Sequence, residues 1–396
     1  MMLGKTNIIY VERDQESGMQ FVKEYMQTKS SSHISRVRYY NGVLFAFTGD
    51  GAEKGKYVLG GSDPGKMDYL KYNGAMIDVT DVQFFDGTYI FYNRNKSFEW
   101  DKENKTITLE YYAGADLLQL EKRSLAYTVN KAGWPDYATT YGSIIGVETS
   151  SDGSLVFLLF IHGEVSTDKK ATMWYVMEIM GDMDTMQREI VTEEKNFYVG
   201  DHLGVRFMRD RFWGLNRWNE TCYILTLDGM ITQQNGTLSP DAIIDDIAYY
   251  IVEGKIYYSI NFTSRLLLWS SGQAADTIFP IRDRIAVYRK NSIVSSSTLL
   301  LADSFNDIKD NKMTSIVIGA LSDYTIMGWA EAGEYTYLGG PDGIIVKCFL
   351  DMDGSYQRPE IALVKTLAAK EALAEANKYT DEKLAELKAY VDSKFQ

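Results

Sequence analysis

The hydrophobic pattern of this chain repeats as pairs of alternating apolar segments joined by a short polar turn. The segment VRYYNGVLFAF (Val37 to Phe47) aligns with VQFFDGTYIFY (Val82 to Tyr92), and an Asn-Gly or Asp-Gly pair stands at the centre of each. Alternating apolar residues on both sides of such a pair are the strongest local signal for a β-hairpin. The turn glycines, Gly42 and Gly87, lie 45 residues apart, so the repeating unit is longer than one hairpin.

Similar hairpins recur, with turns near residues 42, 87, 153, 211, 254, 284 and 333. Their mean spacing of about 48 residues is close to the length of one four-stranded propeller blade. The sequence therefore predicts an all-β, β-propeller-like domain of about six to seven blades over residues 31–350. In the N-terminal arm, residues 1–30, the segment Thr6 to Glu12 is a candidate outer strand that closes the ring. A pair of β-sandwiches is the alternative fold.

The C-terminal segment has a different pattern. After a linker at 351–358, residues 359–396 contain no glycine and are rich in Ala, Leu, Glu and Lys, which favour helix. Spacings of four and three residues place one seam along this predicted helix, as in a coiled coil that joins copies of the chain. The seam residues are Leu373, Asn377, Thr380, Leu384, Leu387 and Val391. The alternative is a single amphipathic helix that folds back on the β domain.

The run EANKYTDEKLAELKAYVDSK within this helix resembles the helical linkers of bacteriophage tail-fibre, tail-appendage and baseplate proteins. In that family the pattern A-N-x-Y-T-D-x-K-[IL] recurs in trimeric stalks. The resemblance covers residues 372–394 only, and here the helix stands at the C-terminal end of the sequence. It implies a virion protein that assembles with itself, with a trimer favoured, and with other tail proteins.

Composition and charge narrow the choice of partners. The net charge of −13 argues against sequence-independent binding of DNA or RNA, because an acidic surface repels phosphate backbones. Two cysteines support neither a disulfide framework nor a zinc site. The N-terminus lacks the apolar core of a signal peptide, and no run of 18 apolar residues predicts a membrane span. We therefore expect synthesis in a host cytoplasm and a final place in the virion.

The motifs for chemistry are weak. Gly60 to Lys66 has the spacing of a nucleotide-binding phosphate loop, but Met67 follows where a magnesium-binding Ser or Thr is required. The stretch Ser150 to Phe157 resembles in part the Asp-box turn of sialidases, and Asp245 with Asp246 are candidate channel carboxylates. No histidine lies in a metal-ligand spacing, and no cofactor is predicted.

These observations favour a non-enzymatic structural or adhesion component of a phage tail or baseplate. Its candidate ligand is a glycan of the host cell surface, because aromatic rings in loops stack well on sugars. The candidate ligand-binding residues are Trp134, Tyr137 and Tyr141. The alternative is a glycan-binding or glycan-hydrolysing propeller of the sialidase or glycosidase class.

Overall fold

The structure is a computed structural model, and two compact units are distinguished in it. Unit 1 comprises Met1–Glu12 and Phe21–Leu350, and unit 2 comprises Arg13–Gln20 and Asp351–Gln396. Within them the structure describes residues 8–13, 18–49, 57–101, 103–128, 139–164, 171–183, 185–193, 206–216, 221–235, 240–245, 247–260, 265–270, 274–289, 297–318, 326, 328–356, 378–380, 383 and 388.

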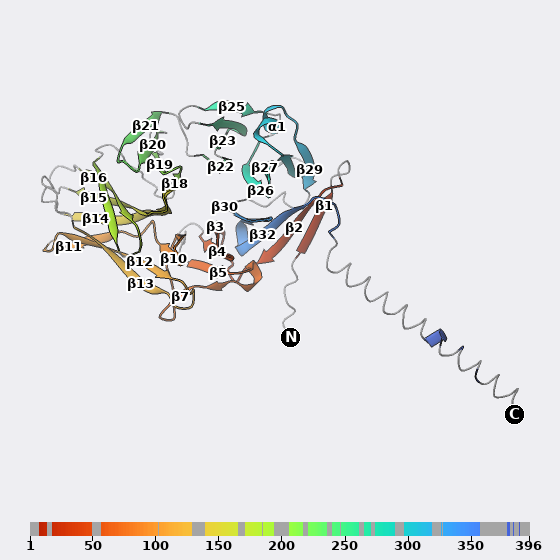
Figure 1. Cartoon of the computed structure of the whole chain (residues 1–396), viewed down its shortest axis with the longest axis horizontal. Coiled ribbons are helices and arrows are strands. Elements are labelled where there is room, and N and C mark those ends of the chain that lie inside the picture. The colour runs from red at the N-terminus through yellow and green to blue at the C-terminus, as the bar shows by residue number, and fades with distance from the viewer. Residues whose placement is uncertain are drawn as a thin grey trace. The chain divides into compact units, whose positions relative to one another are not determined.

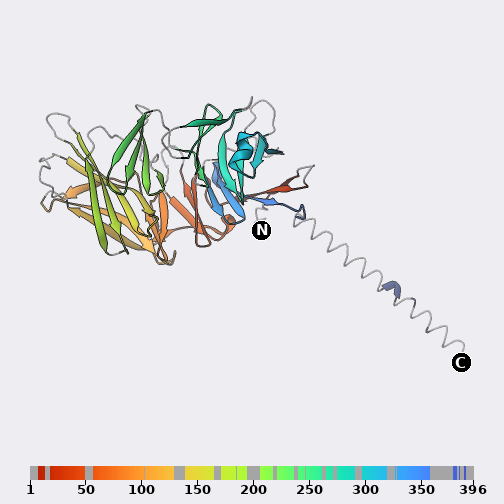
Figure 2. The same cartoon turned by 45° about the horizontal axis from the view of Figure 1, so that its top comes forward.

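Unit 1 is built from antiparallel strands that are arranged in successive groups around a common centre (Figure 1 and Figure 2). The described strands make up seven such groups, which we number blade 1 to blade 7 in chain order. Blade 1 is β3 (Ile34–Tyr40), β4 (Val43–Thr48), β5 (Tyr57–Gly61) and β6 (Asp68–Tyr69). Blade 2 is β9 (Asp81–Phe85), β10 (Thr88–Tyr92), β12 (Thr106–Gly114) and β13 (Glu121–Thr128). Blade 3 is β14 (Thr139–Thr149), β15 (Leu155–Glu164), β16 (Ala171–Met180) and β17 (Met186–Glu193).

The remaining blades follow the same order. Blade 4 is β18 (Arg206–Met208), β19 (Arg211–Asn216), β20 (Thr221–Thr226) and β21 (Ile231–Asn235). Blade 5 is β22 (Ala242–Ile244), β23 (Ile247–Val252), β24 (Lys255–Ser259) and β25 (Leu266–Trp269). Blade 6 is β26 (Thr277–Ile281), β27 (Arg284–Arg289), β28 (Ser297–Ala302) and β29 (Thr314–Ile318). Blade 7 contains β30 (Gly328–Ala332), β31 (Tyr335–Gly339) and β32 (Ile344–Asp351).

Blade 7 is completed from the other end of the chain. Its strand order is β1-β2-β32-β31-β30, so β2 (Gln20–Gln27) and β1 (Ile8–Arg13) form its outer strands. The Thr28 hydroxyl donates to the Gly343 carbonyl at 2.7 Å, across 315 residues of sequence. The first described strand therefore lies in the same sheet as the last described strand, which closes the ring.

Shorter elements connect the blades. The strand β11 (Phe98–Asp101) pairs with both β12 and β14, and thereby joins blades 2 and 3 into one nine-stranded sheet. A two-stranded ribbon, β7 (Lys71–Tyr72) and β8 (Ala75–Met76), follows blade 1, and α1 (Phe305–Lys309) lies between β28 and β29. Two 3-10 turns, η2 (Pro64–Lys66) and η4 (Pro341–Gly343), follow the third strand of blade 1 and the second strand of blade 7.

Turn chemistry explains the inner hairpins. Asn41 and Gly42 both have positive φ, +48° and +79°, as do Asp86 and Gly87 at +43° and +73°. Two successive residues of positive φ are typical of the two-residue type I′ turn, whose twist matches that of the strands it joins. The equivalent turn of blade 4 uses Arg209 and Asp210, although neither is glycine.

Apolar side chains pack between neighbouring blades. Phe45 and Phe47 of blade 1 are fully buried in one cluster with Tyr89 and Phe91 of blade 2, and Phe45 meets the Phe91 ring edge-on at 5.5 Å. Successive side chains of a strand point to opposite faces of its sheet, so each blade can bury both of its faces only by packing between two neighbouring blades. This topology confirms the predicted all-β propeller, and the described strands form seven blades.

The long C-terminal helix is not established by the structure. The only residues described in that segment are Lys378–Thr380, Lys383 and Lys388, which are helical. The exposed Thr380 is the one seam residue among them. Leu373, Asn377, Leu384, Leu387 and Val391 lie outside the described residues. The helix and its coiled coil therefore remain predictions.

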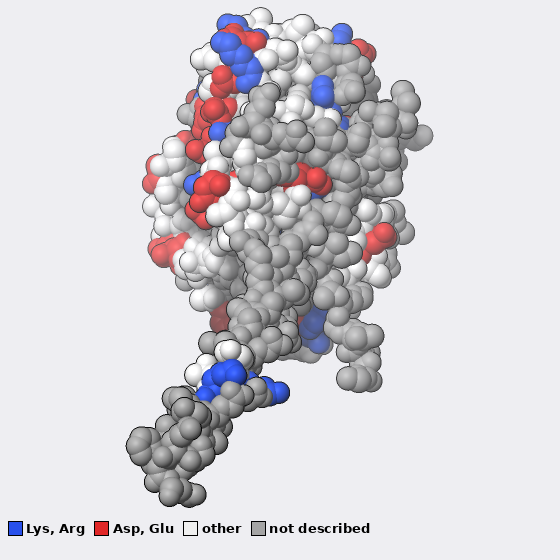
Figure 3. Space-filling model, turned by 90° about the vertical axis from the view of Figure 1, so that its right-hand side faces the viewer, with Lys and Arg blue, Asp and Glu red and all other residues white. Residues whose placement is uncertain are grey.

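The described surface carries charges of both signs. Figure 3 shows acidic and basic side chains on the same face of the molecule. Among the described residues, no helix has the length and apolar character needed to cross a membrane.

Candidate functional site

A cavity of about 570 Å³ lies on the axis of the propeller, and the innermost strand of every blade contributes to its wall. We call it the axial cavity. One lining residue from each blade, in chain order, is Arg36, Asp81, Glu148, Phe207, Ile243, Ile278 and Trp329. A pocket that collects side chains from seven repeats is the expected place for a ligand site in this architecture.

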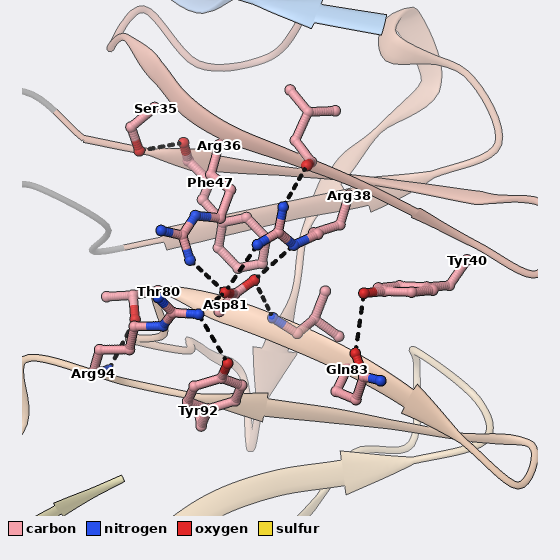
Figure 4. Close-up of polar contacts among 12 residues, drawn as sticks. Ser35, Arg36, Arg38, Tyr40, Phe47, Thr80, Asp81, Gln83, Tyr92 and Arg94 are labelled. Atoms are coloured by element: carbon pink, nitrogen blue, oxygen red, sulfur yellow. Dashed lines mark hydrogen bonds and ion pairs between the residues drawn. The ribbon is translucent and has the colours of Figure 1, made fainter. Parts of the chain in front are cut away.

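Asp81, the first residue of β9, is the centre of the most polar part of the cavity (Figure 4). Arg38 donates two hydrogen bonds to the Asp81 carboxylate, one from Nε to Oδ1 at 3.1 Å and one from Nη2 to Oδ2 at 3.2 Å. Arg36 also donates to Oδ2, and the backbone N–H of Val82 donates to Oδ1 at 3.0 Å. The alternation of β3 places Arg36 and Arg38 on the same face, two residues apart, toward blade 2.

Arg94 completes the group from the turn that follows β10. Its Nη2 donates to Oδ2 of Asp81 at 2.6 Å and to the Tyr92 hydroxyl at 3.2 Å, and its backbone N–H donates to the Thr80 hydroxyl at 2.9 Å. We call Arg36, Arg38 and Arg94 around Asp81 the arginine cluster. Asp81 and Arg94 are 2% and 3% exposed, whereas Arg36 and Arg38 are 20% and 33% exposed and reach the open part of the cavity.

The arginine cluster fixes the charge of Asp81. Burial alone raises the pKa of this carboxyl, but Arg36, Arg38 and Arg94 outweigh it and hold the pKa well below its usual range. Burial lowers the pKa of Arg36 to about 10, against the opposing effect of Asp81, so its guanidinium stays charged at neutral pH. Asp81 is thus a permanent anion held by three cations, and it is a poor proton acceptor.

Glu148 on β14 has a different environment in the same cavity. Among the described residues, none donates a hydrogen bond to its carboxyl group. Burial, followed by the charge of Asp81, raises the pKa of Glu148 to about 7, although Arg94, Arg38 and Arg36 counteract part of the shift. This carboxyl therefore exchanges a proton near neutral pH, unlike Asp81.

A chain of neutral groups links the first three blades beside these charges. The Tyr40 hydroxyl donates to Gln83 Oε1 at 3.0 Å, and Gln83 Nε2 donates to the Thr149 hydroxyl at 2.8 Å. Burial raises the pKa of Tyr40, so its hydroxyl stays protonated. These bonds join β3, β9 and β14 and hold the residues on either side, Arg38 and Glu148, in position.

The opposite wall carries carboxylates. Asp241 precedes β22 and Asp276 precedes β26, and both line the cavity. The Ile251 N–H donates to Asp241 Oδ2 at 2.6 Å, which fixes the orientation of this side chain. In a ring of seven blades, blade 5 faces the junction of blades 1 and 2. The axial cavity therefore has a wall of arginines on one side and a wall of acidic residues across the axis.

The structure describes one of the three aromatic residues that the sequence predicts to bind a ligand. Trp134 and Tyr137 lie outside the described residues. Tyr141, expected in a loop, is in strand β14, where its backbone pairs with His162 and Glu99, and it does not line the axial cavity. Whether these three aromatics bind a ligand remains a prediction.

The other motifs are structural turns. Asp63 caps η2 by accepting the Gly65 N–H at 2.9 Å, so this N–H in the glycine stretch 60–66 already has an acceptor within the protein. Asp152 accepts from the Ser150 hydroxyl at 2.5 Å and from the Ser154 N–H at 3.0 Å within the β14–β15 turn. Asp245 is an exposed residue of the β22–β23 turn, while Asp246 lies outside the described residues. No group of three or more metal-ligand side chains occurs among the described residues.

Comparisons with known proteins do not assign this chain to a family. No family model matches the sequence, and no curated protein matches it. Solved structures of similar fold include a streptogramin B lyase, with 10% identity and a TM-score of 0.49 over 84% of this chain and 98% of that one. A virginiamycin B lyase from Staphylococcus aureus has 11% identity and a TM-score of 0.46 over 87% and 99%. The β-propeller domain of the Trilobed protease from Pyrococcus furiosus has 13% identity and a TM-score of 0.41 over 84% and 99%.

The class of this protein is therefore a seven-bladed β-propeller, an assignment that rests on its own sheet topology. At these identities and scores the activities of the similar structures carry no argument for this chain.

Proposed function

We propose that this protein is a non-enzymatic attachment component of a phage tail or baseplate. In this proposal the propeller binds a glycan of the host surface in its axial cavity, and the C-terminal segment joins the chain to other copies or to other virion proteins. The observation that supports ligand binding is the cavity itself, which is lined by residues from seven blades and carries charged side chains of blades 1, 2, 3, 5 and 6. The heptad pattern and the resemblance of residues 372–394 support the assembly role.

The state of the arginine cluster favours binding over chemistry. Asp81 receives hydrogen bonds from three guanidinium groups and one backbone N–H, which leaves it little capacity to attack a substrate or take up a proton. The same contacts hold Arg36 and Arg38 in fixed positions before a ligand arrives. Preorganised donors of this kind lower the entropic cost of binding.

Titration calorimetry with host cell-wall polysaccharide, paired with an assay for released reducing sugar, tests this function. Saturable binding without sugar release is the expected result. Sugar release would contradict the non-enzymatic assignment, and a complete lack of binding would contradict the assignment of the cavity to glycan.

The assembly role has its own test, which is light-scattering mass after size exclusion for the full chain and for a chain shortened to end at Gln357. The expected result is a full-length trimer and a monomeric shortened chain, because the predicted seam lies entirely beyond Gln357. Two monomers would remove the support for assembly through the tail.

A second candidate function is glycan hydrolysis, and one observation favours it. Glu148, with a pKa of about 7, and Asp81, held ionised, occur in one cavity, and glycosidases use a protonated and an ionised carboxyl in this way. Hydrolysis that disappears in Glu148→Gln while polysaccharide binding persists would favour this candidate over the first.

A further inference from the structure

The geometry points to an acidic sugar as the ligand of the axial cavity, with its carboxylate bound by Arg36 and Arg38 in competition with the charge of Glu148. This inference rests on the ligand-binding function proposed above and specifies its chemical class. Arg36 and Arg38 carry N–H donors that the protein leaves unused. A guanidinium has five N–H groups, of which Arg36 uses one, on Asp81. Arg38 uses three, two on Asp81 and one on the Val37 carbonyl.

The remaining N–H groups of Arg36 and Arg38 are available to a ligand, because these two side chains are the exposed members of the arginine cluster. Among the described residues, no further acceptor bonds with either of them. Planar guanidinium groups match carboxylates in geometry and charge, and the bonds they form are about twice as strong as neutral ones. Around this point three arginines face two carboxyl groups, Asp81 and Glu148, so a positive charge remains uncompensated.

The rest of the cavity suits the body of a sugar. Asp241 and Asp276 across the axis are acceptors for hydroxyl groups, which a sugar carries in abundance. Trp329 and Phe207 also line the cavity and offer aromatic surface to the apolar face of a pyranose ring. The volume of about 570 Å³ lies within the range of ordinary small-ligand pockets. A hexuronate combines the carboxylate, hydroxyl groups and ring that these walls select.

Protonation of Glu148 is coupled to this binding. The charged and titratable groups that act on Glu148 come from β3, β9, β10 and the turn after β10, and they are Arg36, Arg38, Tyr40, Asp81, Tyr92 and Arg94. A bound carboxylate near the arginines adds a negative charge next to Glu148, so it favours the protonated form. Because its pKa is about 7 in the free protein, affinity for an acidic sugar falls as the pH rises through neutrality.

The test compares glucuronate with glucose, since the two differ only by a carboxylate in place of a hydroxymethyl group. Binding to the full chain is measured by calorimetry or by ligand-observed NMR, with sugar concentrations up to about 10 mM to detect weak affinities. Wild type is compared with Arg36→Gln, which keeps Arg38 and Arg94 on Asp81, and with Lys255→Gln as a control that removes an exposed positive charge on blade 5. Thermal melting establishes that each variant is folded.

We expect glucuronate to bind at least about 10-fold more tightly than glucose, and Arg36→Gln to weaken glucuronate binding by about 10- to 100-fold. Lys255→Gln keeps the wild-type affinity. Glu148→Gln tightens glucuronate binding above pH 7 and removes its pH dependence, a result that does not depend on the Arg36 variant. Equal affinity for the two sugars, or glucuronate binding unaffected by Arg36→Gln, overturns this inference while glycan binding stands. Absence of binding by both sugars and by polysaccharide overturns the proposed function as well.

Discussion

The substitution Asp81→Asn tests how much the arginine cluster contributes to stability. It removes the one carboxylate that all three arginines contact, while an amide oxygen and similar side-chain volume remain. Arg36 and Arg38 are 20% and 33% exposed and can be hydrated from the cavity, but Arg94 is only 3% exposed. Removing one partner of a buried ion pair costs about 3–5 kcal/mol, because the other charge stays buried. We therefore expect the free energy of unfolding to fall by about 3–5 kcal/mol, with Arg94 responsible for most of it.

Urea denaturation, followed by tryptophan fluorescence and circular dichroism, measures this change, and an unaltered m-value shows that the folded and unfolded states are comparable. A double-mutant cycle with Arg94→Met isolates the pair, for which we expect a coupling of about 1–3 kcal/mol. A loss of less than about 1 kcal/mol in Asp81→Asn, or no coupling, would refute the view that the buried Arg94 depends on Asp81.

The pH dependence of the same variant follows from the lowered pKa of Asp81. A carboxyl whose pKa is lower in the folded state stabilises the protein above its unfolded pKa of about 3.9 and loses this effect as the pH falls through the folded pKa. The stability difference between wild type and Asp81→Asn should thus shrink as the pH is lowered below about 4. A stability difference between the two proteins that stays constant down to pH 2 would contradict the lowered pKa of Asp81.

Two further predictions concern other parts of the fold. Glu178 is buried opposite Glu189 across β16 and β17, and burial followed by the Glu189 charge raises its pKa to about 7. A carboxyl whose pKa is raised by folding contributes stability that is complete below its unfolded pKa and is lost as the pH rises through its folded pKa of about 7. We therefore expect Glu178→Gln to be more stable than wild type by up to about 3 kcal/mol at pH 8 and equally stable at pH 4. Thermal melts at the two pH values measure this difference. Gly343 has φ of +69°, and a Cβ there would lie 1.9 Å from the Ser30 carbonyl oxygen, whereas Gly333, with φ of +66°, has open space around it. Gly343→Ala should therefore lower the melting temperature clearly more than Gly333→Ala, and equal effects would exclude the close contact as the cause.

The fold was accessible from sequence because its turns carry local signals. Asn41-Gly42 and Asp86-Gly87 are true inner hairpin turns, and the hairpins near 153, 211, 284 and 333 are also the first of their blades. The turn at Glu253-Gly254 is different, since it joins β23 and β24, the second and third strands of blade 5. The sequence between β22 and β23 contains no glycine, so it carries no glycine signal for the inner turn of that blade. Because the sequence pattern identifies the second turn of blade 5 and the first turn of the other blades, part of the uneven spacing between the seven turns is explained.

The candidate site was missed although a signal for it exists. The aligned repeats begin at Val37 and Val82, and extending them by one residue sets Arg36 over Asp81, 45 residues apart. Opposite charges at equivalent positions of adjacent blades meet at the axis, because innermost strands lie side by side there. Arg94 and Glu148 carry no such signal, since their approach depends on how the turn after β10 and the long strand β14 are placed in space.

The closure of blade 7 also sets an order of events during synthesis. The strands β1 and β2 are made first, but their partner β32 ends the propeller and emerges about 315 residues later. At typical elongation rates of about 5–20 residues per second, this delay is roughly 16 to 63 s. During that interval Phe21 and Val22, which are fully buried in the finished ring, have no completed sheet to enter. The ring therefore forms only after the ribosome has released β32, and the timing of translation, rather than the stability of any early blade, determines when the axial cavity first exists.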